Sequence, residues 1–574
     1  MKNLLKYLRH YVKESILAPL FKMLEASFEL FVPLVMAAII DTGIKNSDKP
    51  YIFKMAMVLV GLAVVGFISA LTAQYFAAKA AVGFGKELRS DLYRHINTLS
   101  YSEIDRIGTS TLITRLTADV NQMQTAVNLF LRLFLRSPFI VIGAVVMAFA
   151  VDPKTAMIFA VSIPLLAVVV FGIMFWSVPI YKKVQNRLDS VMRITRENLS
   201  GVRVIRAFNH EQQEIADFDK CSEELKDMQL YGGKISAYLN PITYVIVNLS
   251  IVLIIYFGGL RVDTGRLTQG EVISLINYMS QVLVELIKLS NLIINLTKSV
   301  ACGNRINDVF EIKSTVNDGD GEKTPNNIAV EFDNVSAVYS GSKEKSLDSL
   351  TLSVPRGSTV GVIGATGSGK TTLINLIPRF YDVSEGAVKI NGTDVRNYNT
   401  EELRNIVGVV PQKAALVSGS VRDNLLWGNP NATDDEIRSA LKTAQALDFV
   451  SEKDGGLDYQ ILQGGKNLSG GQIQRLTIAR ALVRKPEILI LDDSSSALDF
   501  ATDAALRRAI KTDTGNMTVF IVSQRFSTIK NADIIIVLDD GKVCGIGKHD
   551  ELFENCAEYR EICESQLSSK EAVK

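Results

Sequence analysis

Residues 364–371, with the sequence GATGSGKT, match the pattern G-x-x-x-x-G-K-[ST] and directly follow an apolar run at residues 359–363. We interpret this run as a buried strand that leads into a loop. Glycines in such a loop let backbone N–H groups turn toward phosphate oxygens, and the start of the next helix adds its positive dipole end. Lys370 is expected to reach the outer phosphates, and the Thr371 hydroxyl is expected to bind Mg²⁺. The pattern therefore predicts a site for ATP with Mg²⁺.

A second apolar run, ILILD at residues 488–492, ends in Asp492 and is followed by Asp493. A carboxylate at the end of such a strand is the usual second anchor for the Mg²⁺ of a nucleotide site. Strands often end in aspartate, so this run alone carries little weight. Together with the loop at residues 364–371, it supports the same nucleotide site.

The segment LSGGQ at residues 468–472 lies between these two motifs and precedes a helical pattern at residues 473–483. LSGGQ between a phosphate loop and an ILILD strand resembles the signature of the nucleotide-binding domains of ABC transporters. The resemblance implies an α/β P-loop domain of the ABC type, which we place at residues 328–574. A polar stretch rich in Gly, Asp and Asn precedes it, and we expect a linker there, at residues 306–327.

The first 300 residues contain the elements that must carry this domain. A helix needs roughly 20 apolar residues to cross a hydrocarbon core of about 30 Å. Six runs reach that length, and three of them contain no Asp, Glu, Lys or Arg. The uncharged runs are residues 55–78, 155–181 and 235–260, and the others are residues 16–40, 129–151 and 272–297. The sequence therefore predicts an α-helical membrane domain with six transmembrane helices at residues 1–305.

Basic residues are distributed unevenly around these runs. Nineteen Lys and Arg residues lie in the amino-terminal tail and in two long connections, at residues 81–128 and 182–238, against six on the other side. Basic loops stay in the cytosol, so we expect a multi-pass protein of the cytoplasmic membrane, with the nucleotide-binding domain and both termini cytosolic. The long connections have helical apolar spacing and are expected to continue the membrane helices as rigid arms. The net charge of +1 disfavours nucleic acid as a partner.

Six spans followed by this domain make nearly the whole chain resemble an ABC exporter half-transporter. The resemblance implies a homologous partner chain in the lipid bilayer and two nucleotide-binding domains stacked head to tail. ATP on one phosphate loop would then be covered by the LSGGQ of the other chain. The resemblance also implies that arm segments near residues 102–107 and 204–209 sit on the nucleotide-binding domains, with ordinary solvated helix as the alternative for both.

The resemblance assigns roles to single residues as well. Tyr339 would stack on adenine, although without the neighbouring motifs it would be interpreted as a core aromatic. Gln412 would contact Mg²⁺ and the membrane arms, and residues 496–499 would form the D-loop. The implied nucleotide-binding residues are Tyr339, Thr366, Gly367, Ser368, Gly369, Lys370, Thr371, Thr372, Gln412, Asp492, Ser469, Gly470, Gly471 and Gln472, with Thr371 and Gln412 as the metal ligands.

Two catalytic positions depart from the pattern of the family. A glutamate usually follows the ILILD aspartate and orients or deprotonates the attacking water, whereas this chain has Asp493. The missing methylene retracts the carboxylate by roughly 1.5 Å, and a misplacement of about 1 Å can lower a rate on the order of a hundredfold. The switch histidine that contacts the γ-phosphate is replaced by Gln524, which donates a hydrogen bond but carries no positive charge. We therefore expect a degenerate, slowly hydrolysing site.

These features together favour an ATP-hydrolysing translocase that exports hydrophobic or amphipathic small molecules, as multidrug exporters do. The chain resembles the degenerate half of bacterial heterodimeric multidrug exporters, in which a partner with Glu and His completes the efficient site. One alternative is neutral drift of Asp493 and Gln524 in an active homodimer. Others are an exporter of lipid or peptide, and an ATP-gated channel or regulatory membrane protein.

Charged residues inside the predicted membrane helices are a further group of functional candidates. Glu25 and Glu29 lie one turn apart, and Glu285 and Lys288 are spaced i, i+3, so each pair shares one helix face. We interpret Glu285 and Lys288 as a mutually satisfied pair in preference to a ligand site. Glu25 and Glu29, with only Lys22 nearby, are less balanced and would favour cationic amphiphiles.

Overall fold

The computed structural model describes residues 4–319, 327–339, 342, 344–494 and 497–571, and the chain divides into two compact units. A helical unit comprises Met1–His95 and Ser110–Glu311, and an α/β unit comprises Ile96–Thr109 and Ile312–Lys574. The short segment Ile96–Thr109 thus belongs with the α/β unit, although it lies in the amino-terminal half of the sequence.

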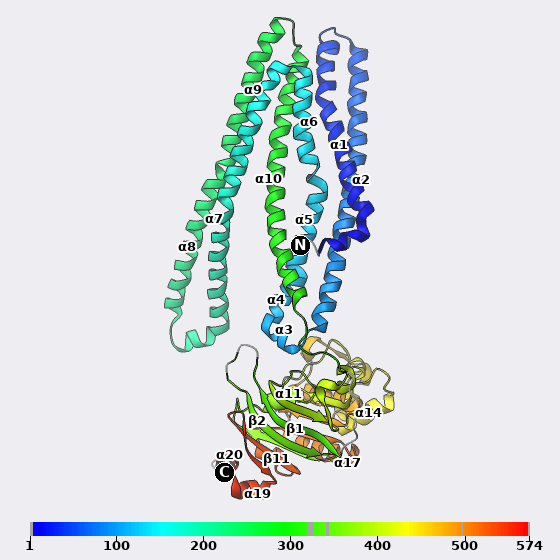
Figure 1. Cartoon of the computed structure of the whole chain (residues 1–574), viewed down its shortest axis with the longest axis vertical. Helices are drawn as coiled ribbons and strands as arrows, with labels where there is room; N and C mark the ends of the chain where they lie inside the picture. Colours follow the sequence, from blue (N-terminus) through cyan, green and yellow to red (C-terminus); the bar gives the residue numbers. More distant parts are fainter. Residues whose placement is uncertain (1–3, 320–326, 340–341, 343, 495–496, 572–574) are drawn as a thin grey trace. The chain divides into compact units, whose positions relative to one another are not determined.

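The helical unit consists of long helices that run side by side (Figure 1). Its elements are η1 (Leu4–Tyr11), α1 (Val12–Ala38), η2 (Ile39–Ile44), α2 (Lys49–Thr98), α4 (Thr109–Thr114), η3 (Arg115–Asp119), α5 (Val120–Leu133), α6 (Arg136–Val151), α7 (Pro153–Ala207), α8 (Glu211–Ala237), α9 (Leu239–Asp263) and α10 (Gln269–Glu311). Six helical segments among the described residues are long and apolar enough to cross a membrane. The predicted number of spans is confirmed, and α10 extends six residues into the stretch expected as linker.

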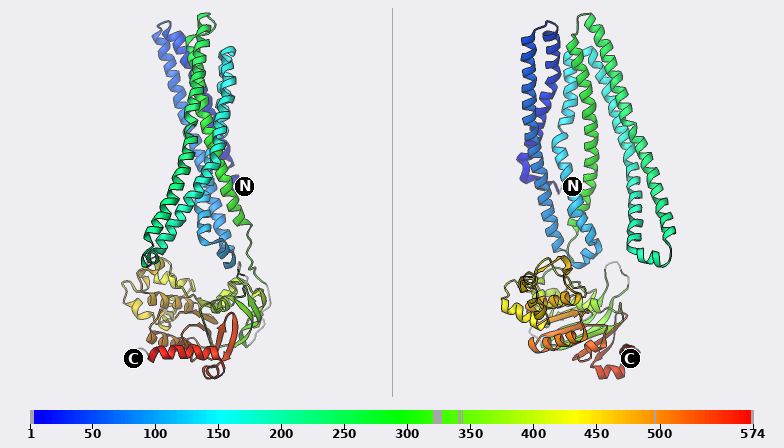
Figure 2. Two further views of the ribbon diagram at one scale, coloured as in Figure 1. Left: turned by 90° about the vertical axis from the view of Figure 1, so that its left-hand side faces the viewer. Right: turned by 180° about the vertical axis from the view of Figure 1, so that it is seen from behind.

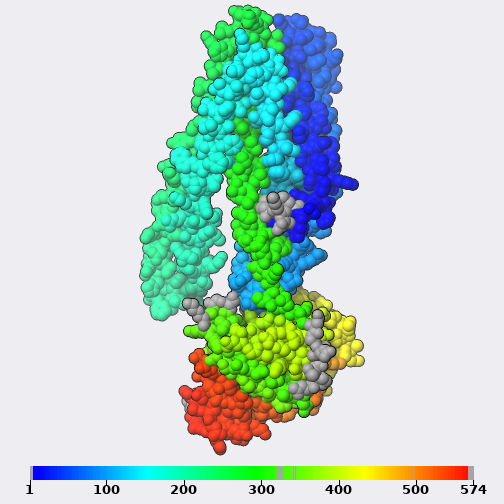
Figure 3. Space-filling model, viewed as in Figure 1, coloured from blue at the N-terminus to red at the C-terminus, as the bar shows by residue number. Residues whose placement is uncertain are grey.

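Several of these helices are much longer than a bilayer is thick. α2 contains 50 residues and α7 contains 55, so at 1.5 Å per residue they are about 75 and 83 Å long. α8 runs beside the second half of α7 (Figure 2). The lower part of this pair stands apart from α10 in the space-filling view (Figure 3). Both long connections are helical over most of their length, as their apolar spacing predicts.

Arg136, at the start of α6, ties three helices of this unit together. Its guanidinium donates hydrogen bonds to Glu285 of α10 and to Glu29 of α1, each at 2.7 Å. Ser137 and Lys288 both donate to the Glu285 carboxylate at 2.8 Å. The predicted Glu285–Lys288 pair is therefore confirmed, but it belongs to a larger network that includes a buried arginine from another helix.

The two glutamates of α1 also have cationic partners. Lys22 Nζ lies 2.5 Å from a Glu25 carboxylate oxygen, and Arg136 binds Glu29. The charge of both carboxylates is thus balanced within the chain, which the sequence alone did not predict.

The described part of the α/β unit contains a six-stranded sheet of order β12-β11-β3-β10-β9-β6, a four-stranded antiparallel sheet of order β2-β1-β4-β5, and the short pair β7-β8. The strands are β1 (Ile328–Ala337), β2 (Leu347–Pro355), β3 (Thr359–Gly364), β4 (Glu385–Ile390), β5 (Thr393–Asp394), β6 (Val407–Val410), β7 (Gly419–Ser420), β8 (Gln460–Ile461), β9 (Ile488–Asp492), β10 (Thr518–Val522), β11 (Ile534–Asp539) and β12 (Lys542–Gly547). Its helices are α3 (Tyr101–Ile107), α11 (Lys370–Leu376), η4 (Val395–Asn397), α12 (Thr400–Ile406), α13 (Val421–Leu426), α14 (Asp434–Thr443), α15 (Leu447–Ser451), η5 (Gly456–Asp458), η6 (Gln463–Gly465), α16 (Gly470–Val483), α17 (Phe500–Asp513), α18 (Phe526–Ile529), α19 (His549–Asn555) and α20 (Ala557–Glu571).

The strands β3, β10 and β9 run parallel through the centre of the larger sheet, with β10 between the other two. Nearly all their residues are buried. Strands covered on both faces have continuous apolar sequences. This is why residues 359–363 and 488–492 could be recognised as strands from the sequence. The carboxyl ends of the three strands meet at one edge of the sheet. The predicted fold class, six membrane-spanning helices fused to an α/β domain, is confirmed.

The Arg136 network leads to a stability prediction. Arg136→Ala removes the guanidinium from two carboxylates, and breaking a buried ion pair costs about 3–5 kcal/mol. We expect the thermal unfolding midpoint in detergent to fall by several degrees. Arg193→Ala is the control, because the Arg193 and Glu197 side chains are 66% and 60% exposed and such pairs contribute about 1 kcal/mol or less. Equal midpoints for both variants would contradict a stabilising role for the network.

Candidate nucleotide-binding and hydrolysis site

The predicted phosphate loop connects β3 to α11 at the carboxyl edge of the sheet. Gly369 has a φ of 94°, and a Cβ there would lie 2.5 Å from the Ser346 carbonyl oxygen. A Cβ on Gly364 would overlap the carbonyl oxygen of a residue at the end of β11. Both positions therefore require glycine for steric reasons, in agreement with the motif.

Lys370 lies inside this loop. Its ammonium group donates hydrogen bonds to the carbonyl oxygens of Gly364 at 2.9 Å and Ala365 at 2.6 Å, and to the Ser368 hydroxyl at 3.3 Å. Burial lowers the pKa of Lys370, while the carboxylates of Asp492 and Asp493 oppose this shift. Ser368 and Thr372 are buried, whereas Thr366 and Gly367 form an exposed tip. The loop thus encloses the Lys370 ammonium group within the turn that the motif predicts for phosphate.

Asp492 and Thr371 supply the oxygens expected for Mg²⁺. The Thr371 hydroxyl lies 3.5 Å from an Asp492 carboxylate oxygen. Burial, with a contribution from Asp493, raises the pKa of Asp492 to about 6. A hydroxyl and a carboxylate are hard oxygen ligands, which Mg²⁺ prefers. The pair fits the ion, whose positive charge would offset the cost of burying the carboxylate.

Asp493 and Gln524 follow directly from two neighbouring strands. The Asp493 N–H donates to the Val522 carbonyl at 3.0 Å, which keeps the chain beside β10 as it leaves β9. Asp493 has a φ of 43°, a left-handed conformation that aspartate adopts more readily than most residues. Gln524 lies two residues beyond β10 and is exposed. The structure therefore places both residues at the phosphate edge, and their catalytic roles remain predictions.

Tyr339 lies beside the first turn of α11. Its hydroxyl donates to Thr372 at 3.2 Å, and its ring meets the Tyr381 ring edge-on at a centroid distance of 5.0 Å. Gln412 is exposed two residues beyond β6, which pairs with β9. Both predicted contact residues thus lie around the same edge as the phosphate loop.

The LSGGQ segment forms the start of α16. The Ser469 N–H donates to the Gln472 side chain at 3.0 Å, and the Gln472 N–H donates to the Ser469 hydroxyl at 3.3 Å, which is a capping box. Ser469 and Gly470 are exposed. Among the described residues, no hydrogen bond links the LSGGQ segment to the phosphate loop. The start of α16, where Ser469 and Gly470 are exposed, is suited to a phosphate from outside the chain.

The predicted D-loop is described only in part. Ser496 lies outside the described residues. A Cβ on Gly471 would lie 3.1 Å from the Ala497 carbonyl oxygen, so this loop packs against LSGGQ. The Asp499 carboxylate accepts from the Thr502 N–H at 2.9 Å and caps α17.

The arm segment near residues 102–107 forms α3, which is part of the α/β unit and contacts Phe380 and Tyr381 there. The Tyr101 ring lies 4.8 Å from the Phe380 ring, and the Tyr381 hydroxyl donates to the Asp105 carboxylate at 2.6 Å. Tyr381 therefore contacts both α3 and Tyr339. Sequence reasoning missed Tyr381 because its partners are distant in sequence. Residues 204–209 belong to the helical unit, and their docking remains a prediction.

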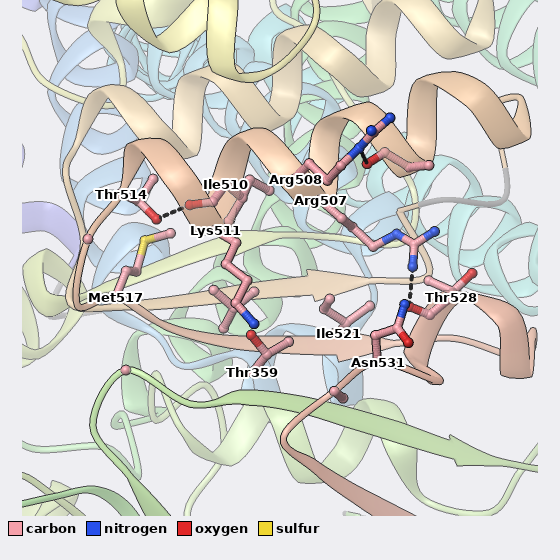
Figure 4. A pocket seen from close by; sticks show the side chains of 15 residues that line it. Thr359, Arg507, Arg508, Ile510, Lys511, Thr514, Met517, Ile521, Thr528 and Asn531 are labelled. Carbon is pink, nitrogen blue, oxygen red and sulfur yellow. Dashed lines mark hydrogen bonds between the residues drawn. The ribbon is translucent and has the colours of Figure 1, made fainter. Parts of the chain in front are cut away.

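A separate cavity of about 430 Å³ lies at the opposite edge of the sheet, against α17 (Figure 4). It is lined by Thr359 at the start of β3 and by Met517, just before β10. Arg507 also lines it and donates to the Thr528 carbonyl at 2.7 Å. Because the phosphate loop and Asp492 lie at the carboxyl ends of these strands, this cavity is not the nucleotide site.

The raised pKa of Asp492 predicts a pH dependence of Mg²⁺ binding. Below about pH 6 the carboxyl group binds a proton that Mg²⁺ must displace, so the gain in ATP affinity on adding Mg²⁺ should fall by roughly tenfold per pH unit. Equilibrium binding of ATP with and without Mg²⁺ between pH 5 and 8 measures this gain.

Asp492→Asn is the control for this measurement, because the γ-phosphate itself titrates near pH 6. The variant should retain only the phosphate dependence. If the native chain and the variant have the same pH profile, Asp492 does not anchor the ion.

Comparisons with known proteins agree with this geometry. Residues 15–286 match the model of the ABC transporter transmembrane region, and residues 347–496 match the ABC transporter model. An uncharacterized ABC transporter ATP-binding protein of Mycobacterium tuberculosis is 36% identical over 570 residues, covering 98% of both chains. An ATP-dependent lipid A-core flippase of Desulfotalea psychrophila is 32% identical over 96% of this chain and 92% of its own.

A solved structure has a similar fold over nearly the whole chain. The bacterial Atm1-family ABC exporter with ATP bound superposes with a TM-score of 0.79 at 22% identity, covering 97% of this chain and 98% of that one. With the family matches on both units and full-length relatives above 30% identity, this chain belongs to the ABC transporter family as a half-transporter of the exporter type.

Proposed function

We propose that the chain is one half of a heterodimeric ABC exporter whose own phosphate loop binds ATP and hydrolyses it slowly. The observation that carries this proposal is the contrast between two groups of residues. Lys370, Thr371 and Asp492 retain the groups that bind ATP and Mg²⁺, whereas Asp493 and Gln524 replace the residues expected to complete hydrolysis.

The backbone at Asp493 supports slow hydrolysis. The hydrogen bond from its N–H to Val522 fixes the main chain against β10. The main chain at Asp493 therefore cannot shift toward the phosphate to compensate for its side chain, which is shorter than that of glutamate by roughly 1.5 Å. Gln524 can donate to a γ-phosphate but adds no positive charge. Both changes weaken the orientation and activation of the attacking water, while Lys370 and Thr371 remain available to bind the phosphates and Mg²⁺.

Two exposed features support association with a second chain. Ser469 and Gly470 at the start of α16 are exposed, and among the described residues of α8 only Gly232 and Ile235 are buried. In our proposal, the LSGGQ of this chain covers ATP on a partner that carries Glu and His, and that site hydrolyses ATP efficiently.

The proposed cargo is a hydrophobic or amphipathic small molecule. A groove of about 450 Å³ between α1 and α2 is lined mainly by apolar side chains, including Phe28, Leu59 and Phe67. Glu25 and Glu29 also line it. A surface of this kind, within the segments long and apolar enough to cross a membrane, is suited to a molecule with an apolar body and a polar group.

A lipid is the second candidate cargo. It is favoured by the relative named an ATP-dependent lipid A-core flippase, which is 32% identical over nearly the whole length. The same apolar groove would admit an acyl chain.

The degenerate-site proposal predicts a gain of function. The purified chain alone should hydrolyse ATP slowly, and the double variant Asp493→Glu, Gln524→His should hydrolyse it on the order of ten- to a hundredfold faster, since both groups would regain their reach and charge. Lys370→Ala in each background is the control for contaminating ATPases. A native chain that is rapidly active alone, with activity lost on Lys370→Ala, would establish an active homodimer. Co-purification from native membranes followed by mass spectrometry identifies the partner.

Transport assays decide between the two kinds of cargo. We expect inside-out vesicles that contain the heterodimer to accumulate an amphipathic dye on addition of ATP, with little movement of a fluorescent phospholipid between leaflets. The partner's Glu→Gln variant at its catalytic position is the matched control. ATP-dependent lipid movement without dye accumulation would favour the flippase.

A further inference from the structure

The segment that carries Gln524 is held by the last helix of the chain. Gln566 of α20 donates through Nε2 to the Gln524 carbonyl oxygen at 2.7 Å, and its Oε1 accepts the Phe526 N–H at 3.1 Å. One partner is an acceptor and the other is a donor, so a single orientation of the amide satisfies both bonds. The side chain thus bridges the backbone on either side of Arg525.

The packing of α20 explains how Gln566 reaches this position. Tyr559, Cys563 and Gln566 are spaced i, i+4 and i+7, so they share one helix face. Tyr559 and Cys563 are fully buried in the core that includes Phe526. The Tyr559 hydroxyl lies 2.9 Å from Nδ1 of His549, whose ring stacks on Phe526. Apolar packing therefore fixes the helix, and the helix presents the Gln566 amide to the loop.

Other contacts hold the far side of α18 independently. Arg507 of α17 donates to the Thr528 carbonyl at 2.7 Å (Figure 4). Loss of the Gln566 amide should therefore loosen the backbone at residues 524–526 without releasing α18.

We infer that Gln566 is a positioning residue that sets the main chain from which the Gln524 side chain reaches the γ-phosphate. Fixing this backbone before ATP binds reduces the ordering that binding requires. The terminal helix would thereby control how well the site distinguishes ATP from ADP, since only ATP carries the γ-phosphate. This inference rests on the role proposed for Gln524.

The first test compares affinities for two nucleotides on the full-length chain in detergent. Gln566→Ala should weaken binding of a non-hydrolysable ATP analogue by roughly two- to tenfold, which corresponds to the loss of ordinary hydrogen bonds, and should leave ADP affinity unchanged. Gln460→Ala is the matched control, because Gln460 is exposed and its side chain bonds locally to the Asp458 carbonyl. Equal weakening of ATP analogue and ADP by Gln566→Ala would indicate a general structural role and would overturn the inference.

A second variant separates the two hydrogen bonds. Gln566→Glu keeps an acceptor for the Phe526 N–H but places a carboxylate against the Gln524 carbonyl. Amide hydrogen exchange at Phe526 should become faster in Gln566→Ala and stay protected in Gln566→Glu, while both variants lose ATP selectivity. Unchanged exchange at Phe526 in Gln566→Ala would mean that the bridge does not hold the loop.

A double-mutant cycle with Gln524→Ala distinguishes failure of this inference from failure of the proposed role of Gln524. Gln524→Ala should reduce ATP selectivity, and adding Gln566→Ala should then have little further effect. If Gln524→Ala leaves selectivity intact, the proposed role of Gln524 is wrong. If Gln524→Ala reduces selectivity but Gln566→Ala does not, or if the two effects simply add, the positioning role of Gln566 is wrong.

Discussion

The nucleotide site depends on one constraint of the sheet, the insertion of β10 between the parallel strands β3 and β9. This order brings the phosphate loop, Asp492 and Gln524 to a single edge. The strands are buried, so the same arrangement raises the pKa of Asp492 and lowers that of Lys370. Burying either charged group alone would be unfavourable, but together they form a site where a bound magnesium–phosphate complex would complete the balance of charge.

Charged residues of the helical unit also need a balancing charge, but here the chain itself provides it. Charges inside a membrane domain require partners, and the chain supplies them internally, since Arg136 joins Glu29 to Glu285 and Lys288 completes the network. Balanced ion pairs of this kind fix the register of three helices. They also give Glu29 a cationic partner within the chain, so in our proposal recognition of cargo would depend chiefly on the apolar walls of the groove between α1 and α2.

The features predicted from the sequence are those encoded in short contiguous stretches. The phosphate loop, the buried strand ending at Asp492 and the long apolar spans have patterns set by a local backbone period or turn. Contacts between distant residues have no such pattern. Arg136 and Glu285 are 149 positions apart, Asp105 and Tyr381 are 276 apart, and Gln524 and Gln566 are 42 apart. Their pairing follows from the tertiary packing of helices, which a single sequence does not specify.

In our proposal, most of the groups that hold the phosphates of ATP are distinct from those that complete its hydrolysis. Lys370 is held in the phosphate loop by hydrogen bonds to the Gly364 and Ala365 carbonyl oxygens, and these bonds do not involve residue 493 or 524. Tyr381 contacts both Tyr339 and α3 within the α/β unit, so if Tyr339 stacks on adenine as we propose, nucleotide binding would affect α3 without hydrolysis. A ligand shifts a conformational equilibrium by its difference in affinity for the two states, and this difference persists for as long as the ligand stays intact. A site that binds ATP firmly but cleaves it slowly would therefore keep one half of an exporter engaged while a faster partner site cycles.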